Sequence, residues 1–387
     1  MDIKIKVSSK FRIAMIVMIA IGIIAIVTGF FSGDAHRTWA NLLLNNFYFL
    51  SLAIGATFWM AMQAITQSGW SSSYLRIPQA MSMYIIVSFV LWLFMFFGLH
   101  DLYHWTHPEA LEHDAILLHK APYLNVPFFT VRFVVFFALW IFLTIRIRNL
   151  SMKEDLEGGT KYFEKIEFSS KVLIFVLAFS FSLFAIDWLM SLDAHWYSTI
   201  YAVKKFVSSF LHGTAVITAI AVILHMNGYL PQLTKSHKAD FSRYIFALSI
   251  IWGYMWFSQY MLIWYANIPE ETVYYVPRIM TEYKELFYAE LIINWLIPFI
   301  FLMWNKVGKT NWGLLTITGI LIIGQWIELY MSIMPGTVES HSISYIEIGS
   351  FIGYAGLFAL VVATALSKAN LIPKKHPYLM ESLHDEH

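Results

Sequence analysis

Four ionisable residues stand inside long apolar stretches of this sequence, where a charge is costly. They are Asp187, His212, Glu290 and Glu328. An ionisable group at bilayer depth costs about 2.5–3.5 kcal/mol on insertion scales, so each requires a partner, water or a function. Carboxylates with a nearby imidazole can accept and pass on protons, because burial and neighbouring charges tune their acidities. These residue types therefore predict proton transfer as the chemistry of the site.

Further polar residues accompany these four, in the same half of the predicted membrane spans. Arg132, Lys205 and Tyr260 lie in apolar segments, and Asp101 ends another. We expect a hydrated, ionisable cluster that opens away from the cytoplasm and conducts protons. In the structural alternative, Arg132 and Lys205 pair with the buried acids and only hold the helices together.

A second polar group is expected beyond the outer ends of the helices, where it would form a lip that docks an extrinsic partner. Its members are Asn267, Glu270, Glu271, Asp193 and His195. The structural alternative is a helix cap within an interfacial aromatic belt.

Haem and metal centres are disfavoured by the residue types. His212 and His225 are thirteen residues apart, a spacing typical of ligands to stacked b-type haems, but the required facing histidines are lacking: His100 and His104 share one helix end. The chain has no cysteine, which excludes disulfides, thiolate-held iron–sulfur clusters and covalent c-type haem. We expect no metal site and no covalently bound cofactor. Any redox chemistry would use a diffusible quinone or quinol, or a partner subunit.

Composition identifies the solvent around these residues. Of 387 residues, 58% are hydrophobic and 13% are charged, against about 25% charged in a soluble domain. Lipid must therefore surround much of the chain, and the net charge of +1 provides no basic face for nucleic acid. A bilayer core needs about 20 apolar residues per helix. Ten segments of the sequence qualify: 11–31, 42–66, 78–100, 123–147, 170–192, 201–226, 243–266, 283–305, 312–334 and 344–367.

The expected fold is an all-α integral membrane protein, with one polytopic domain over residues 1–387 and short connections. Segment 11–31 is longer than a signal-peptide core and no small-residue cleavage site follows it, which predicts a retained helix. With the N-terminus in the cytoplasm, 19 of the 26 lysines and arginines fall on the cytoplasmic side and 7 on the other. Because basic residues are held back from translocation, both termini are predicted to be cytoplasmic.

An internal repeat relates residues 42–192 to residues 201–334. Three sets of positions match in register: 82–97 with 242–257, Gly55 with Gly213, and Ile186–Ser191 (IDWLMS) with Ile327–Ser332 (IELYMS). These matches favour duplication of a four-helix unit, giving two bundles side by side about an axis along the membrane normal, flanked by helices one and ten. Convergent helix-end chemistry is the alternative.

Two segments near the outer surface carry a resemblance to a known family. Ile186–Tyr201 (IDWLMSLDAHWYSTIY) and Phe257–Thr272 (FSQYMLIWYANIPEET) look like the second NrfD-type (polysulfide-reductase-type) membrane subunit of alternative complex III. The resemblance covers nearly the whole chain. It implies a quinol:cytochrome c oxidoreductase of a bacterial inner membrane. The partners implied are a homologous NrfD-type membrane subunit, an extrinsic iron–sulfur subunit and c-type cytochrome subunits.

The resemblance further implies that this subunit supplies helices and a proton route without a redox centre. Two homologous membrane subunits can divide the labour in this family, and we favour quinol binding at the sister subunit over quinol binding here. Three other functions stay open. The chain could bind quinol directly, it could be a structural subunit only, or it could be a secondary transporter. Transporters commonly have Gly- or Pro-broken helices in both halves, whereas Gly253 and Pro298 have no counterpart in the other half.

Overall fold

Ten long apolar helices make up the protein. The computed structural model describes residues 3–338 and 342–383, and within them ten helical segments are long and apolar enough to cross a membrane and no strand occurs. The spans are α1 (Ser9–Phe31), α2 (Ala35–Ile65), α3 to α5 (Arg76–Ser82, Tyr84–Met95, Leu99–Leu102), α8 (Val126–Glu157), α9 (Lys161–Trp188), α10 (Thr199–Met226), α11 (Lys235–Ala266), α14–η5–α15 (Lys284–Leu291, Ile292–Leu296, Ile297–Met303), α17 (Asn311–Ile333) and α18 (Tyr345–Ser367). The expected all-α membrane fold is confirmed.

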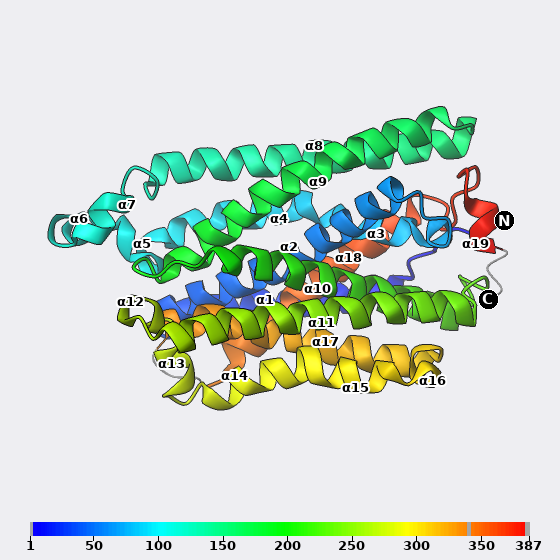
Figure 1. Ribbon diagram of the computed structural model, residues 1–387. Coiled ribbons are helices and arrows are strands. Elements are labelled where there is room, and N and C mark those ends of the chain that lie inside the picture. The colour runs from blue at the N-terminus through cyan, green and yellow to red at the C-terminus, as the bar shows by residue number, and fades with distance from the viewer. Residues whose placement is uncertain (1–2, 339–341, 384–387) are drawn as a thin grey trace.

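Short helices connect these spans. They are η1 (Ser72–Tyr74), η2 (Phe96–Gly98), η3 (His104–Thr106), α6 (Pro108–His113), α7 (Ala115–Lys120), η4 (Met190–Leu192), α12 (Pro269–Thr272), α13 (Val276–Ile279), α16 (Asn305–Gly308), η6 (Met334–Gly336) and α19 (Leu379–Leu383). Within Figure 1, α19 lies at one end of the molecule, whereas α6, α7, α12 and α13 lie at the other. Near α19, the backbone N–H of Leu371 donates to the carbonyl of Ile3 at 2.9 Å. We call this end the termini side and the opposite end the distal side.

The helices form two four-helix bundles. In the first bundle α2, α3–α4, α8 and α9 pack together, and in the second α10, α11, α14–α15 and α17 do so. Figure 1 shows the bundles side by side, with α8 and α9 at one edge and α14 and α15 at the other. The bundles meet chiefly where α2 packs on α10, while α1 and α18 pair with each other against α2.

Glycines bring α2 and α10 into backbone contact. A Cβ atom added to Gly55 would lie 1.9 Å from the carbonyl oxygen of Ser209, and one added to Gly213 would lie 2.7 Å from the carbonyl carbon of Gly55. The predicted repeat aligns these two glycines with each other. Equivalent residues meet where they lie on a twofold axis, so this contact is the geometry that a twofold arrangement of the two bundles would give. The duplication itself stays a prediction.

Small residues also form the seam between α1 and α18. A Cβ on Gly22 would lie 2.5 Å from the Cα of Gly353, and a Cβ on Gly349 would lie 2.5 Å from the Cβ of Ala25. Without a hydrophobic driving force between helices in lipid, close packing of small residues is what holds such a pair together.

The helices extend beyond their apolar segments on the termini side. Residues 149–169, which lie between two of the ten expected segments and were therefore counted among the connections, are mostly helical, because α8 continues to Glu157 and α9 begins at Lys161. The turn between them is made by Gly158 and Gly159, with φ of 75° and 79°. Lysine, arginine and glutamate are good helix formers, so the helix continues where the apolar pattern stops.

Candidate functional site

A closed ion pair lies in the first bundle, between α8 and α9. Nε and Nη2 of Arg132 donate to the two carboxylate oxygens of Asp187 at 2.7 and 3.0 Å. The guanidinium also donates to the carbonyl of Tyr123 at 3.1 Å and lies 3.9 Å from the centre of the Tyr123 ring. Both partners are buried. A two-point pair of this kind is strong and geometrically specific, and it matches the structural alternative for Asp187.

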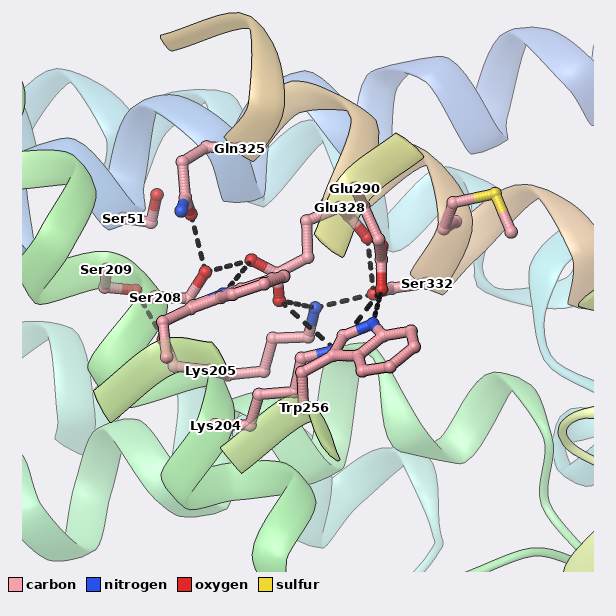
Figure 2. Close-up of polar contacts among 12 residues, drawn as sticks. Ser51, Lys204, Lys205, Ser208, Ser209, Trp256, Glu290, Gln325, Glu328 and Ser332 are labelled. Carbon is pink, nitrogen blue, oxygen red and sulfur yellow. Dashed lines mark hydrogen bonds and ion pairs between the residues drawn. The ribbon is translucent and has the colours of Figure 1, made fainter. Parts of the chain in front are cut away.

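The second bundle holds Glu328 in a more branched network. Nζ of Lys205 lies 2.9 Å from Glu328 Oε1, Nε1 of Trp252 donates to Oε2 at 3.0 Å, and Ser208 Oγ also contacts Oε2. Lys205 donates further to Ser332 Oγ at 2.5 Å. Figure 2 shows these side chains converging from α10 and α17, and Trp252 adds a donor from α11. Glu328 therefore has three donors from two neighbouring helices.

Lys204 links Glu328 to a second buried acid. Its Nζ lies 3.9 Å from Glu328 Oε1 and 3.7 Å from Oε1 of Glu290, on α14. Nε1 of Trp256 donates to the same oxygen of Glu290, as Figure 2 shows. We call Lys204, Lys205, Glu290 and Glu328 the four-charge cluster. Two ammonium groups balance two carboxylates, and one ammonium is shared between both acids.

A break in the eighth span places Glu290 in this cluster. Pro298 lacks the N–H that would bond to the carbonyl of Asn294 one turn earlier, and Ser249 Oγ of α11 donates to that carbonyl instead. The helix widens to a π-turn at η5, which begins two residues after Glu290. The side-chain amide of Asn294 donates to the carbonyls of Glu290 and Gly324, both at 3.0 Å. Such π-bulges are frequent at functional sites.

A small polar cavity lies beside Glu290. Its volume is about 10 Å³, which holds one water molecule. Its lining residues are Lys204, Trp256, Gln259, Tyr274, Tyr275, Arg278, Phe287, Glu290, Met331 and Ser332. Burial raises the pKa of Tyr274 and of Tyr275, so both phenols keep their protons at neutral pH.

Arg278 forms the wall of this cavity toward the distal side. It donates to the carbonyls of Met331 at 2.9 Å and Ser332 at 3.2 Å. Its Nη2 lies 3.5 Å from Oδ2 of Asp193, whose side chain is 30% exposed. A series of polar groups therefore runs from the buried cluster to the distal surface: Glu290, the cavity, Arg278 and Asp193.

His212 lies where α10 packs on α2, one helical turn from Ser208. Its Nε2 is 2.9 Å from the hydroxyl of Tyr48, which donates its own proton to the carbonyl of Ile322 at 3.0 Å. Tyr48 must then accept, so the proton of His212 is on Nε2. Nδ1 faces Ser51 Oγ at 3.5 Å. Hydroxyl groups thus occupy both ring nitrogens, and neither faces an open coordination position.

The structure places the remaining predicted pathway residues outside the cluster. Tyr260 is half-buried and packs on Trp256, with ring centres 5.7 Å apart. Asp101 is exposed on the first bundle.

Residues of the predicted lip lie on the distal side but have separate roles. Asn267 ends α11 in the left-handed conformation, with φ of 48°, as the helix-cap alternative predicted. Glu270 is exposed and Glu271 is partly buried in α12. His195 pairs with Asp114, which also caps α7 through the N–H groups of Ile116 and Leu117.

Some members of the site were not singled out from the sequence. Trp252 and Trp256 are four residues apart and therefore share a helix face. A buried indole N–H needs an acceptor, so this spacing was a usable signal for a buried acid opposite α11. Ser208 and Arg278 gave no such signal, because their partners lie on other helices or are backbone carbonyls.

No protein-family model matches this chain, and no curated protein matches its sequence significantly. The fold and the site define a class: an all-α, multi-pass membrane protein with a four-charge cluster inside one of two helix bundles.

Proposed function

We propose that this chain is a subunit of a respiratory quinol:cytochrome c oxidoreductase in a bacterial inner membrane, and that its second bundle provides a periplasm-side proton pathway. The observation that carries the proposal is Lys204, shared between Glu290 and Glu328 beside a water-sized cavity. The resemblance of Ile186–Tyr201 and Phe257–Thr272 to the second NrfD-type subunit of alternative complex III supports the assignment. In this proposal the chain has no redox centre of its own.

The chemistry required of such a subunit is proton transfer. Oxidation of a quinol releases two protons with two electrons, and groups on the periplasmic side must accept and release those protons. Glu328 has three donors and stays an acceptor, whereas Glu290 borders the cavity and exchanges its proton with water there. Movement of the Lys204 ammonium toward one acid favours the charged form of that acid and the neutral form of the other.

Orientation and partners follow from the same proposal. The 19-to-7 excess of basic residues supports a cytoplasmic termini side, which makes the distal side periplasmic. The extrinsic iron–sulfur subunit and c-type cytochromes would then contact the distal side, near the exposed Glu270. The homologous NrfD-type subunit would contact this chain within the membrane.

The test uses the purified whole complex. Glu290→Gln and Lys204→Met should each lower proton-coupled quinol:cytochrome c turnover by roughly tenfold or more, the lower range of general acid–base effects. Glu285→Gln, an exposed acid on the same helix α14, is the matched control and should turn over normally. Subunit composition is checked for each variant. Unchanged turnover and unchanged proton release in an intact Glu290→Gln complex would leave the cluster with a structural role only.

Direct quinol binding is the second candidate, and one cavity favours it. A groove of about 310 Å³ on the distal side of the first bundle is lined by His119, Lys120, Tyr123, Met190 and Trp196 among others. This volume is at the lower end of ligand pockets. A photoreactive quinone should crosslink to these segments and be displaced by native quinol. Absence of competed crosslinking removes this candidate.

A further inference from the structure

Glu154, on α8 at the termini side, is a buried carboxyl group without a partner. Its exposed fraction is 0%, and neither carboxylate oxygen accepts a hydrogen bond from any residue in the described part of the chain. Its neighbour Asp155, by contrast, pairs with Arg76 and accepts the backbone N–H of Lys374 at 3.0 Å. Burying an unpaired carboxylate is among the costliest arrangements in a protein. Glu154 therefore requires either a bound ligand beside its carboxyl group or protonation of that group.

A small cavity adjoins this carboxyl group. It has a volume of about 20 Å³ and is lined by Glu154, Gln63 and Ser68, together with apolar side chains and other hydroxyls. Gln63 donates from Nε2 to the hydroxyl of Tyr244 at 3.2 Å. Its carbonyl oxygen, Oε1, takes no part in that bond. Within the described residues, Gln63 Oε1 and Ser68 Oγ also lack hydrogen-bond partners. Unpartnered buried polar groups are few in native proteins, so three around one cavity point to a ligand.

Size, charge and donor type limit what that ligand can be. A cavity of about 20 Å³ admits one water-sized particle and excludes organic molecules. One carboxylate excludes anions, and carboxylate, amide and hydroxyl oxygens favour hard cations. Ca²⁺ takes six to eight oxygen ligands and would leave a net positive charge buried beside one carboxylate. A monovalent cation satisfies both conditions.

The charged groups that surround Glu154 are committed elsewhere. Arg76 pairs with Asp155, and Arg148 donates to two backbone carbonyls at 2.8 and 2.7 Å. His376 lines the cavity from the C-terminal segment, and burial lowers its pKa to about 4. The ring is therefore uncharged at neutral pH. Arg76 acts on Glu154 only through space, and none of these groups, which face the site in the described structure, donates a hydrogen bond to the Glu154 carboxyl group.

We propose that Glu154, Gln63 and Ser68 form a site for a single monovalent cation, Na⁺ or a proton, on the termini side. The site belongs to the first bundle and does not depend on the proton pathway proposed for the second. Either cation neutralises the carboxylate. The amide oxygen of Gln63 and the hydroxyl oxygen of Ser68 coordinate Na⁺ or accept the hydrogen bond of the protonated carboxyl group.

The C-terminal segment closes this site. Besides His376, which lines the cavity, Lys374 bonds to Asp155 and Nζ of Lys375 donates to the carbonyl of Leu156 at 2.6 Å. The cation would exchange when residues 374–376 detach from the end of α8.

The test is carbodiimide labelling of the purified protein followed by peptide mass spectrometry. Dicyclohexylcarbodiimide adds a protonated carboxyl across its C=N bond, and the adduct rearranges to a stable N-acylurea with all atoms retained. Labelling of Glu154 should fall as pH rises, by about tenfold per unit above its midpoint. If Na⁺ is the ligand, sodium chloride should lower labelling several-fold against choline chloride at equal pH. If the ligand is only a proton, labelling should follow pH alone.

Two variants make the result specific. Gln63→Leu should keep the labelling of Glu154 but lose protection by Na⁺, and Glu164→Gln, at an exposed position of α9, should alter neither. A second readout is the melting temperature, which should rise with the bound cation in the wild type and lose that dependence in Glu154→Gln. The proposal is overturned if Glu154 labels no more at neutral pH than the exposed Glu164 and is unaffected by Na⁺, or if wild type and Glu154→Gln show the same cation dependence of melting.

Discussion

Two buried acids, Asp187 and Glu328, occupy matching positions of the predicted repeat, yet their partners differ. Asp187 has both oxygens on one guanidinium, whereas Glu328 shares its oxygens among an ammonium, an indole and a hydroxyl. Arginine is a rigid fork that stays charged, whereas lysine is a point charge on a flexible stem whose donors can turn between acceptors. A lysine network can therefore rearrange as protons move, which is why the proposed pathway belongs to the second bundle.

Replacing Arg132 by Met should destabilise the protein by about 3–5 kcal/mol, because Asp187 is left buried without its partner. Replacing Asp187 by Leu in the same chain should recover most of that loss, since two apolar side chains can fill the space of a buried pair. Denaturant unfolding in detergent measures both. A double variant no more stable than Arg132→Met would show that the pair is not an isolated unit.

Among the elements, the crossing of α2 and α10 tolerates the least change. Gly55→Ala should cost about 1–3 kcal/mol, because the new Cβ meets the backbone at Ser209 and the helices must move apart. Gly319→Ala on α17 is the control, since nothing lies within 4 Å of its Cβ position. Removing a glycine from a helix interior gains up to about 1 kcal/mol, so Gly319→Ala should melt no lower than the wild type. Equal losses in both variants would contradict close contact at α2 and α10.

On the distal side, α7 is anchored by Asp114. The hydrogen bond with His195 comes first among the causes that lower the Asp114 pKa, followed by the backbone N–H of Leu117. A depressed pKa means that the contribution to stability is complete above the unfolded value of about 3.9 and is lost as pH falls through the folded value. Asp114→Asn should therefore speed hydrogen exchange in α7 at neutral pH. The matched change Glu109→Gln, on neighbouring α6, should leave exchange in α7 unaltered.

The sequence predicted the elements better than their ends and their contacts. All ten spans were identified, because each requires a long apolar run. The helical parts of 149–169 were missed because apolar periodicity stops at the membrane surface while the helix continues, and Glu154 was therefore overlooked in a supposed loop. The pairings of Arg132 and Lys205 were expected as alternatives. The position of Glu290 in the cluster could not be predicted from the sequence. It depends on Ser249, on another helix, which donates to the carbonyl that Pro298 leaves without a partner.

At the scale of the whole molecule, the polar groups with functional interest lie in different bundles and at opposite ends. The four-charge cluster connects to the distal side through Arg278 and Asp193 in the second bundle. The Glu154 cavity lies at the termini side in the first bundle. Neither assignment places a continuous polar route across one bundle.

The orientation of the whole molecule decides which side each group faces, and the chain is well suited to a direct measurement because it contains no cysteine. Thr160→Cys at the turn between α8 and α9 and Glu109→Cys on α6 each introduce one exposed thiol, at the termini and distal sides respectively. In the proposed orientation, with the termini side cytoplasmic, a membrane-impermeant maleimide on intact cells should label only Glu109→Cys. After permeabilisation both variants should react, which controls for exposure of Thr160→Cys. Labelling of Thr160→Cys alone in intact cells would invert the orientation and place the four-charge cluster toward the cytoplasm, whereas labelling of both would contradict an odd number of spans between them.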